Sequence, residues 1–216
     1  MLIGLSGTKG SGKDTVFLRS VAMAERMGLP KPERLAFADP LKESASKLLG
    51  IPVEDLDKWK NDDPSSTGHL TILGRPMSIR LFLQRYGTEA HRDVFGQDFW
   101  IDATLPMNFI HQGRLVFVTD VRFDNEARRV KSVGGLNYSI VARQVDEGDT
   151  HASEMGISSK LVDQKIINTS FDDGFSFLDQ QVRAMLADFD EDDYENPFDQ
   201  SEFGIPNNLS IVDAGE

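Results

Sequence analysis

Short apolar runs alternate with longer segments of mixed polarity over the first 187 residues. Five runs have strand length and composition, at 2–6, 34–38, 115–119, 138–142 and 165–168. Five segments between and after them have helical patterns: 13–27, 40–49, 78–86, 125–133 and 175–187. A glycine follows each of the first four and suits a helix end: Gly28, Gly50, Gly87 and Gly134. Strands that alternate with helices predict an α/β fold, a five-stranded parallel sheet flanked by helices.

Two segments depart from this alternation. The polar stretch 52–75, with Trp59 and a turn-like run at 62–66, is typical of an insertion outside the sheet. Residues 188–216 carry ten acidic and no basic side chains, which predicts a disordered or loosely docked tail. Of the whole chain's net charge of −12, residues 1–187 carry only −2. A cluster of cations in the body is therefore compatible with the acidic total, whereas nonspecific binding to a nucleic-acid polymer is not expected.

Composition also narrows the cellular setting. The chain has no cysteine, which excludes disulfides, thiolate nucleophiles and thiolate metal sites. Its first residues, MLIGLSG, lack the features of a signal peptide, and no window is apolar for long enough to span a membrane. We therefore expect a cytoplasmic protein with no membrane partner.

The segment G-T-K-G-S-G-K-D-T, residues 7–15, follows the first predicted strand and opens the first predicted helix. Gly7, Gly12 and Lys13 satisfy the G-x-x-x-x-G-K spacing of a phosphate-binding loop. Glycines let successive backbone N–H groups point inward, and the helix N-terminus adds its positive end. A simple glycine-rich connection is the alternative, but the strand and helix context favours a site for ATP, with Lys13 reaching the β- and γ-phosphates. The binding loop itself comprises Gly10, Ser11, Gly12, Lys13, Asp14 and Thr15.

The loop departs from the general pattern after its lysine. Asp14 stands where Ser or Thr would ligate Mg²⁺, and the hydroxyl comes one residue later, at Thr15. We assign Thr15 to phosphate. Asp14 either contacts the shell of the metal or stabilises the helix N-terminus, and the sequence favours neither. No direct protein ligand for Mg²⁺ is predicted; Thr15, Asp14 or Asp120 would act through water.

Later segments extend the pattern. With the phosphate loop, the chain resembles the deoxynucleoside monophosphate kinases of bacteriophages, a branch of the P-loop kinases related to adenylate and guanylate kinases. The resemblance covers residues 1 to about 187 and rests on F-A-D-P-L-K (37–42), S-I-R-L-F-L-Q-R-Y-G-T-E (78–89), D-F-W (98–100), D-V-R-F-D-N-E (120–126), T-H-A-S-E (150–154) and I-I-N-T-S-F-D-D (166–173). It implies a P-loop kinase fold and transfer of the ATP γ-phosphoryl group to a deoxynucleoside monophosphate (dNMP), with Mg²⁺. It also implies a host-cytoplasm setting if the gene is viral, and it makes a homodimer plausible.

The resemblance assigns substrate contacts to the middle of the chain. These are Asp39, Lys42, Arg80, Gln84, Gly87, Thr88 and Trp100. Arg80 and Gln84 are four apart, so on a helix they share one face and suit a phosphate and a base edge. Solvated helix charges are the plainer interpretation of Lys42 and Arg80, and a core position is the plainer one for Trp100. The roles of Arg85 and Arg92 are not assigned.

The remaining candidates lie after predicted strands. Asp120 would hold Mg²⁺ through water or fix Arg122, Arg122 would meet the acceptor or the transferred phosphoryl group, and Glu126 would orient Arg122. The predicted catalytic set is Lys13, Asp120, Arg122 and Arg143, the last at the start of a lid over about 143–160. His151 and Glu154 match the family there without a clear role, and Arg128 and Arg129 either assist the lid or are solvated. Asn168 lies where the family receives adenine.

The expected organisation is a kinase domain over 1–187, with a monophosphate-binding insertion at about 51–105, followed by the tail. Two alternatives to a dNMP kinase stay open at this stage. One is another small-molecule P-loop kinase, of the phosphomevalonate or dephospho-coenzyme A type. The other is a noncatalytic ATP-binding module, against which the basic residues after strand ends argue.

Overall fold

The computed structural model describes residues 1–59, 70–72, 75–142, 156–168 and 174–189 of the chain. Five strands form one sheet in the order β2-β5-β1-β6-β7, and every neighbouring pair is parallel. The strands are β1 (Leu2–Ser6), β2 (Glu33–Leu35), β5 (Val116–Val121), β6 (Leu136–Ala142) and β7 (Gln164–Asn168). The predicted α/β fold with a five-stranded parallel sheet is confirmed, and it agrees with a P-loop kinase.

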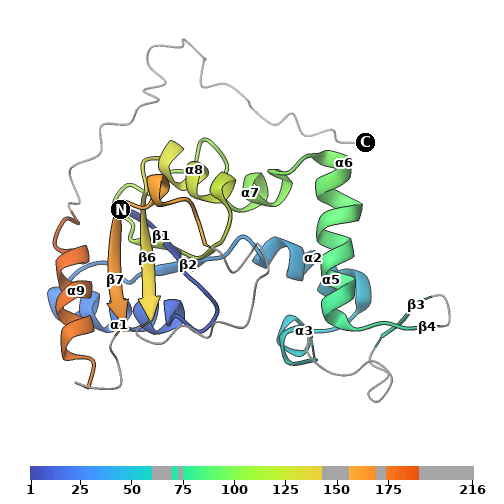
Figure 1. The fold of residues 1–216 in the computed structure, drawn as a ribbon, viewed down its shortest axis with the longest axis horizontal. Coiled ribbons are helices and arrows are strands. Elements are labelled where there is room, and N and C mark those ends of the chain that lie inside the picture. Colours follow the sequence, from blue (N-terminus) through green and yellow to red (C-terminus); the bar gives the residue numbers. More distant parts are fainter. Residues whose placement is uncertain (60–69, 73–74, 143–155, 169–173, 190–216) are drawn as a thin grey trace, which may run out of the picture.

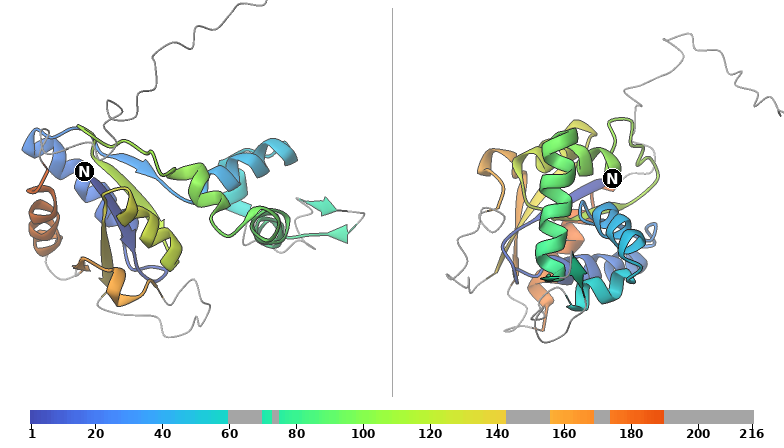
Figure 2. Two further views of the ribbon diagram at one scale, coloured as in Figure 1. Left: turned by 90° about the horizontal axis from the view of Figure 1, so that it is seen from above. Right: turned by 90° about the vertical axis from the view of Figure 1, so that its right-hand side faces the viewer.

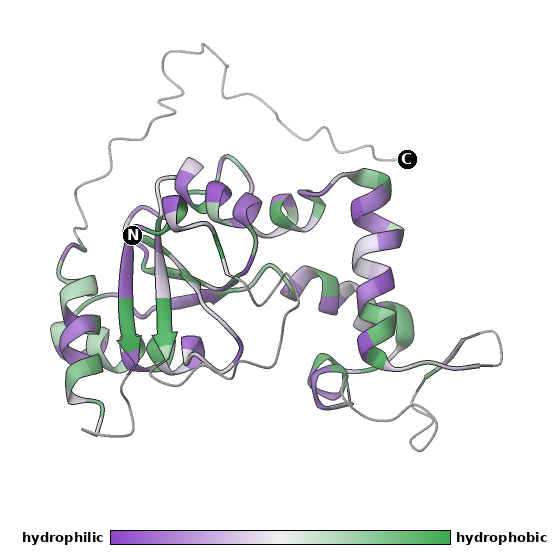
Figure 3. Cartoon of the chain, in the orientation of Figure 1, coloured by the Kyte–Doolittle hydropathy of each residue, from purple (hydrophilic) through white to green (hydrophobic). Residues whose placement is uncertain are grey.

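Helices cover both faces of the sheet (Figure 1). Helices α1 (Lys13–Met27) and α9 (Ser176–Leu186) pack together against the face that presents Ile3, Leu5 and Phe117. Helix α8 (Asp124–Ser132) packs on the opposite face against Val116, Val118 and their neighbours. Strands β1 and β5 are therefore buried on both sides, as central parallel strands are. At the edge of the sheet, β7 begins with hydrophilic residues, continues with two hydrophobic ones and ends at Asn168 (Figure 3).

Glycines end three helices as predicted. Gly28, Gly50 and Gly134 follow α1, α2 (Asp39–Leu49) and α8 with φ of 71°, 65° and 83°, in the left-handed region. The expected helix end at Gly87 is wrong. Gly87 has φ −72°, and α5 (Ile79–Gly87) continues through a π-helical turn, η1 (Thr88–Arg92), into α6 (Asp93–Phe95).

Tertiary packing explains that difference. Gly87 is buried, and a Cβ there would lie 3.1 Å from a methyl group of Leu41. Its carbonyl accepts a 3.0 Å hydrogen bond from the indole N–H of Trp100. The glycine is therefore needed for close approach to α2, and the helix has no reason to end there.

A group of elements stands apart from the sheet, and we call it the helical arm (Figures 1 and 2). It comprises α3 (Val53–Trp59), β3 (Thr71–Ile72), β4 (Arg75–Pro76), α5, η1 and α6. The arm has its own apolar cluster, built on Ala45 of α2 with Leu56, Leu70 and Ile79. Helix α7 (Phe99–Thr104) then returns to the sheet, where Ile101 and Leu105 join the cluster beneath α8. The arm overlaps the predicted insertion at 51–105, and its substrate-binding role stays a prediction.

Little of the predicted lid and tail is described. Of the lid at about 143–160, the structure describes residues 156–160, which lead into a short 3-10 turn, η3 (Ser159–Leu161). Residues 143–155, including Arg143, His151 and Glu154, and the tail beyond residue 189 lie outside the described residues. Among the helices that are described, none is both long and apolar enough to cross a membrane.

Candidate active site

The phosphate loop lies at the carboxyl edge of the sheet, between β1 and α1. Three of its glycines have positive φ: Gly7 (144°), Gly10 (77°) and Gly12 (93°). A Cβ at Gly7 would lie 2.5 Å from the carbonyl oxygen of Ile140, and one at Gly12 would lie 2.0 Å from Nδ2 of Asn168. Both positions combine a conformation that favours glycine with a close neighbour, which is a main-chain oxygen at Gly7 and a side-chain amide at Gly12. The loop conformation thus depends on this spacing of glycines.

Side chains around the loop hold it in a curled form. Lys13 Nζ donates to the carbonyls of Gly7 and Thr8, at 2.8 and 3.0 Å. Asn168, at the end of β7, donates from Nδ2 to the carbonyl of Ser11 at 3.0 Å. Asn168 therefore lies against the phosphate loop and braces it, near the position predicted for the ATP site.

One polar atom of the loop is buried without a hydrogen-bond partner among the described residues. It is the hydroxyl of Ser11, a side chain that is 1% exposed. Buried hydroxyls normally have a partner, so this atom fits a loop that receives an oxygen-rich ligand. Asp14 is exposed and Thr15 is half-buried in the first turn of α1.

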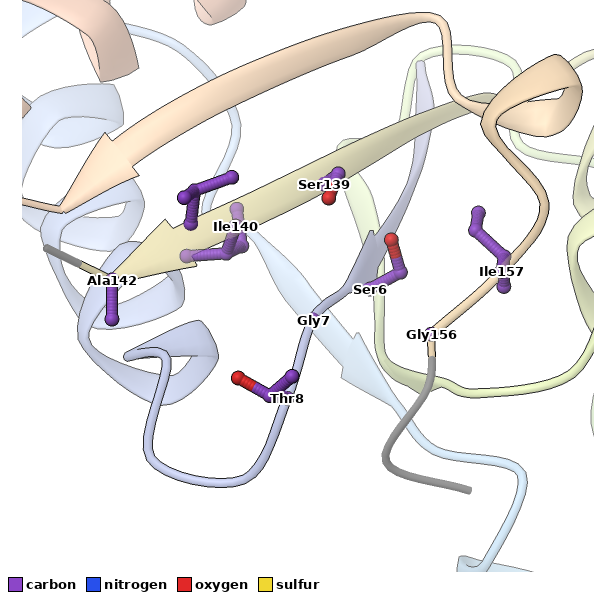
Figure 4. A pocket seen from close by; sticks show the side chains of 9 residues that line it. Ser6, Gly7, Thr8, Ser139, Ile140, Ala142, Gly156 and Ile157 are labelled. Carbon is purple, nitrogen blue, oxygen red and sulfur yellow. The ribbon is translucent and has the colours of Figure 1, made fainter. Parts of the chain in front are cut away.

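A pocket of about 160 Å³ adjoins the loop (Figure 4). It is lined by the end of β1 with Gly7 and Thr8, by Ser139 to Ala142 of β6, and by Gly156 and Ile157. Ligand sites are commonly about 300–1,000 Å³. The pocket therefore accounts for only part of a nucleotide, beside the phosphate loop and next to the segment that precedes η3.

Asp120 connects the end of β5 to the turn before α2. One carboxylate oxygen accepts from the backbone N–H of Phe37 at 2.7 Å, and the other accepts from that of Ala38 at 3.0 Å. Burial raises the pKa of Asp120, and these two hydrogen bonds oppose the rise. Since both oxygens are engaged with the main chain of residues 37 and 38, Asp120 holds in place the turn that leads into α2, the helix that carries Asp39 and Lys42. That contact differs from the predicted fixing of Arg122.

Glu126 stabilises the start of α8 next to Asp120. Its Oε2 accepts from the backbone N–H of Arg122 at 2.7 Å and of Phe123 at 3.1 Å. Glu126 is 3% exposed, and burial, with the nearby charge of Asp120, raises its pKa to about 7 against the effect of these hydrogen bonds. It orients Arg122 through the main chain, while the Arg122 side chain is exposed.

The predicted substrate residues fall into two environments. Lys42 is half-buried and its Nζ forms an ion pair with Asp57 of α3 at 2.8 Å, while Asp39 pairs with Arg34 at 3.2 Å. Exposed side chains on α5 and η1 are Arg80, Gln84 and Thr88.

Gly87 and Trp100 instead belong to the packed interior. Trp100 is 4% exposed, and its indole N–H is used by the carbonyl of Gly87. In this arrangement Trp100 supports the arm from inside and does not present a face on which a base can stack, and Gly87 contributes close packing. The core alternative for Trp100 is the one that agrees with its position.

Two residues with contacts to the candidate site were not assigned from the sequence. Asp57 is the partner of Lys42. Arg92 of η1 lies 3.8 Å from Glu126, and its guanidinium lies over the ring of Phe123, 5.5 Å from the centroid. Neither pair is close in sequence, so helical or strand periodicity holds no signal for them.

Comparisons with known proteins show the family of this chain. The profile of the deoxynucleotide monophosphate kinase family matches residues 64–175. A protein of Acanthamoeba polyphaga mimivirus, assigned by name to the deoxynucleotide monophosphate kinases, is 30% identical over 182 residues, which cover 78% of this chain and 88% of the relative. The deoxynucleoside-5'-monophosphate kinase of Escherichia phage T5 is 23% identical over an alignment that covers 84% of this chain and 94% of the relative. The chain therefore belongs to the deoxynucleotide monophosphate kinase family.

Proposed function

We propose that this protein transfers the γ-phosphoryl group of ATP to a 2′-deoxynucleoside 5′-monophosphate and so forms the diphosphate and ADP. The observation that carries the proposal is the position of the phosphate loop. It lies on the same sheet edge as the end of β5, which is followed by Arg122, in a chain that belongs to this kinase family. Family membership favours a nucleotide acceptor over phosphomevalonate or dephospho-coenzyme A.

The phosphate loop fits the triphosphate of ATP. It offers a helix N-terminus, the ammonium group of Lys13, and the buried hydroxyl of Ser11, which has no hydrogen-bond partner in the part of the chain that the structure describes. Lys13 Nζ, which contacts the carbonyls of Gly7 and Thr8, would turn to the phosphate oxygens when they are present. Asn168 would keep Ser11 and Gly12 in place while Lys13 turns from these carbonyls to the phosphates.

Mg²⁺ would be held through water and phosphate oxygens, as the sequence predicts. Within the described segments, no three His, Asp or Glu side chains converge in a way that could hold a metal ion. Asp14 and Thr15, in the first turn of α1, carry groups that can hydrogen-bond to metal-bound water. Asp14 and Thr15 would hold Mg²⁺ through water, and the bound ion would offset the negative charge of the phosphates during transfer.

The chain's own contribution would be positioning and electrostatic stabilisation, because phosphoryl transfer needs no covalent nucleophile. Lys13 would bind the donor phosphates and Lys42 with Arg80 the monophosphate, while Arg122 would stabilise the transferred group. Asp120 would hold the turn that leads into α2, and Glu126 the turn that carries Arg122. Arg143, outside the described residues, is proposed as the lid cation.

The test is ADP release with dAMP, dGMP, dCMP and dTMP at saturating ATP and Mg²⁺. We expect turnover with at least one of them, and a loss of about 100-fold or more in kcat for Lys13→Ala, because removal of one charge-stabilising group commonly costs that much. Lys47→Ala, an exposed lysine in the last turn of α2, is the matched control. Absence of ADP release with all four monophosphates contradicts the proposal, and turnover with dephospho-coenzyme A instead would support the alternative acceptor class.

A further inference from the structure

The helical arm is attached to the sheet domain at the start of α8. Arg92 of η1 reaches Glu126 at 3.8 Å and stacks on Phe123 at 5.5 Å. Beside this contact, Asn125 of α8 donates to Asp98, just before α7, at 2.7 Å. Together these contacts join Arg92 and the residue before α7 to Phe123 and to the first turn of α8.

The turn after β5 contains the exposed Arg122, and Glu126 fixes the main-chain conformation of this turn through hydrogen bonds. One oxygen of Glu126 accepts the N–H groups of Arg122 and Phe123, while the other faces Arg92. The Glu126 side chain is 4% exposed and that of Arg92 is 22% exposed, so solvent weakens this charge pair little compared with a surface pair. Arg92 therefore acts on the same carboxylate that holds the Arg122 turn.

We propose that Arg92 is a positioning residue, which joins the helical arm to Glu126 and Phe123 and so sets the place of Arg122 relative to the substrate residues of the arm. The arm carries Arg80 and Gln84, whereas Arg122 belongs to the sheet domain. For transfer to occur, side chains of the helical arm and of the sheet domain must contact the same substrate at the same time. A misplacement of one group by about 1 Å can lower the rate by about 100-fold. The kinetic part of this inference rests on the proposed function.

The contact favours arginine over lysine. A planar guanidinium can lie on the ring of Phe123 and present its edge to Glu126 at the same time, whereas an ammonium group keeps the charge but stacks poorly. The variant Arg92→Lys should therefore keep part of the contact with Glu126 that Arg92→Gln loses.

The variants are Arg92→Gln and Arg92→Lys, with Arg85→Gln as the matched control. Arg85 lies seven residues earlier on the same continuous helix, and it makes an exposed ion pair of similar length, 3.7 Å, with Glu89. Both substitutions to glutamine remove one arginine charge from the arm, but only one removes the link to α8.

The first readout is amide hydrogen exchange of the nucleotide-free protein. Arg92→Gln should speed exchange at the amides of residues 122–127, which depend on Glu126 and on the first turn of α8, and leave β1 and β5 unchanged. Arg85→Gln should leave residues 122–127 as in the wild type. Equal exchange of this segment in both variants overturns the inference, whether or not the protein is a kinase.

The second readout separates kcat from KM with a deoxynucleoside monophosphate as acceptor. We expect Arg92→Gln to lower kcat by about 10- to 100-fold, as loss of a residue that supports a site residue commonly does, with the KM for ATP unchanged and with partial recovery in Arg92→Lys. A kcat equal to that of Arg85→Gln, or a loss that appears only in the KM for ATP, contradicts the positioning role. If the wild type turns over no monophosphate, the proposed function fails, and the exchange experiment still decides the role of Arg92. If Arg92→Gln does not fold, Arg92→Lys gives both readouts with a smaller expected effect.

Discussion

Glu126 combines deep burial with a carboxyl group that can still lose its proton near neutral pH. The side chain caps two backbone N–H groups and is 3% exposed, and its pKa is raised to about 7. The substitution Glu126→Gln keeps an oxygen that can accept hydrogen bonds from both N–H groups, but the glutamine side chain cannot ionise. It should therefore change how stability depends on pH more than it changes the fold.

The magnitude follows from the two pKa values. In the unfolded chain the carboxyl group titrates near its ordinary value of 4.5, and in the folded chain near 7. Because the folded pKa is the higher one, the native state binds more protons between these values, and the free energy of unfolding falls as pH rises through this window. A separation of about two and a half pH units corresponds to about 3 kcal/mol, fully lost only above pH 7.

The assay is urea unfolding of wild type and Glu126→Gln at pH values from about 4 to 8. We expect the variant to gain about 3 kcal/mol relative to wild type between pH 4.5 and pH 7. The difference between the proteins is the informative quantity, because burial also lowers the pKa of His111 in both of them. Glu54→Gln, an exposed glutamate of α3, should give a difference that does not change with pH. A constant difference for Glu126→Gln, or one that favours wild type as pH rises, would refute the reasoning.

Two other substitutions test the loop and the arm. Gly12→Ala should abolish the ATP-dependent rise in melting temperature, because its φ is 93° and the new methyl group would lie 2.0 Å from Nδ2 of Asn168. The control Gly10→Ala, whose methyl group would meet no atom within 4 Å, should retain part of the rise. An equal loss in both variants would count against the Asn168 contact. Trp100→Phe should lower the free energy of unfolding by about 1–3 kcal/mol, because the buried carbonyl of Gly87 loses its indole donor. Chemical denaturation measures this loss, and an unchanged midpoint would show that the hydrogen bond adds no net stability.

Most of the sheet domain could be predicted from local patterns. The predicted apolar runs overlap all five strands of the sheet, and the helical pattern at 13–27 agrees with α1 at both ends. The glycine-rich loop could also be predicted from the sequence, because its glycines and Lys13 lie within seven consecutive residues and the loop conformation depends on these glycines. These features depend on neighbours in the chain, so periodicity and composition carry them.

The role of Gly87 was mistaken because it depends on distant residues. As a sequence signal, a glycine after a helical pattern indicates a helix end, whereas Leu41 and Trp100 give this one a packing role inside a longer helix. For Asp120, the position after a strand suggested metal-bound water or Arg122 as a partner, and that role stays a prediction. The tertiary structure adds the N–H groups of Phe37 and Ala38, 83 and 82 residues away, for which the sequence holds no signal.

The sequence by itself thus determined the parallel α/β sheet, the glycine-rich loop between β1 and α1 and the stretch of chain that leaves the sheet. Only the tertiary structure decided how the cations and acids around that loop are connected. It paired Lys42 with Asp57, placed Asn168 on the loop and brought Arg92 to Glu126 and Phe123. The physical reason is range: local periodicity records which face of an element is buried, but ion pairs and hydrogen bonds between elements form only after the chain has folded.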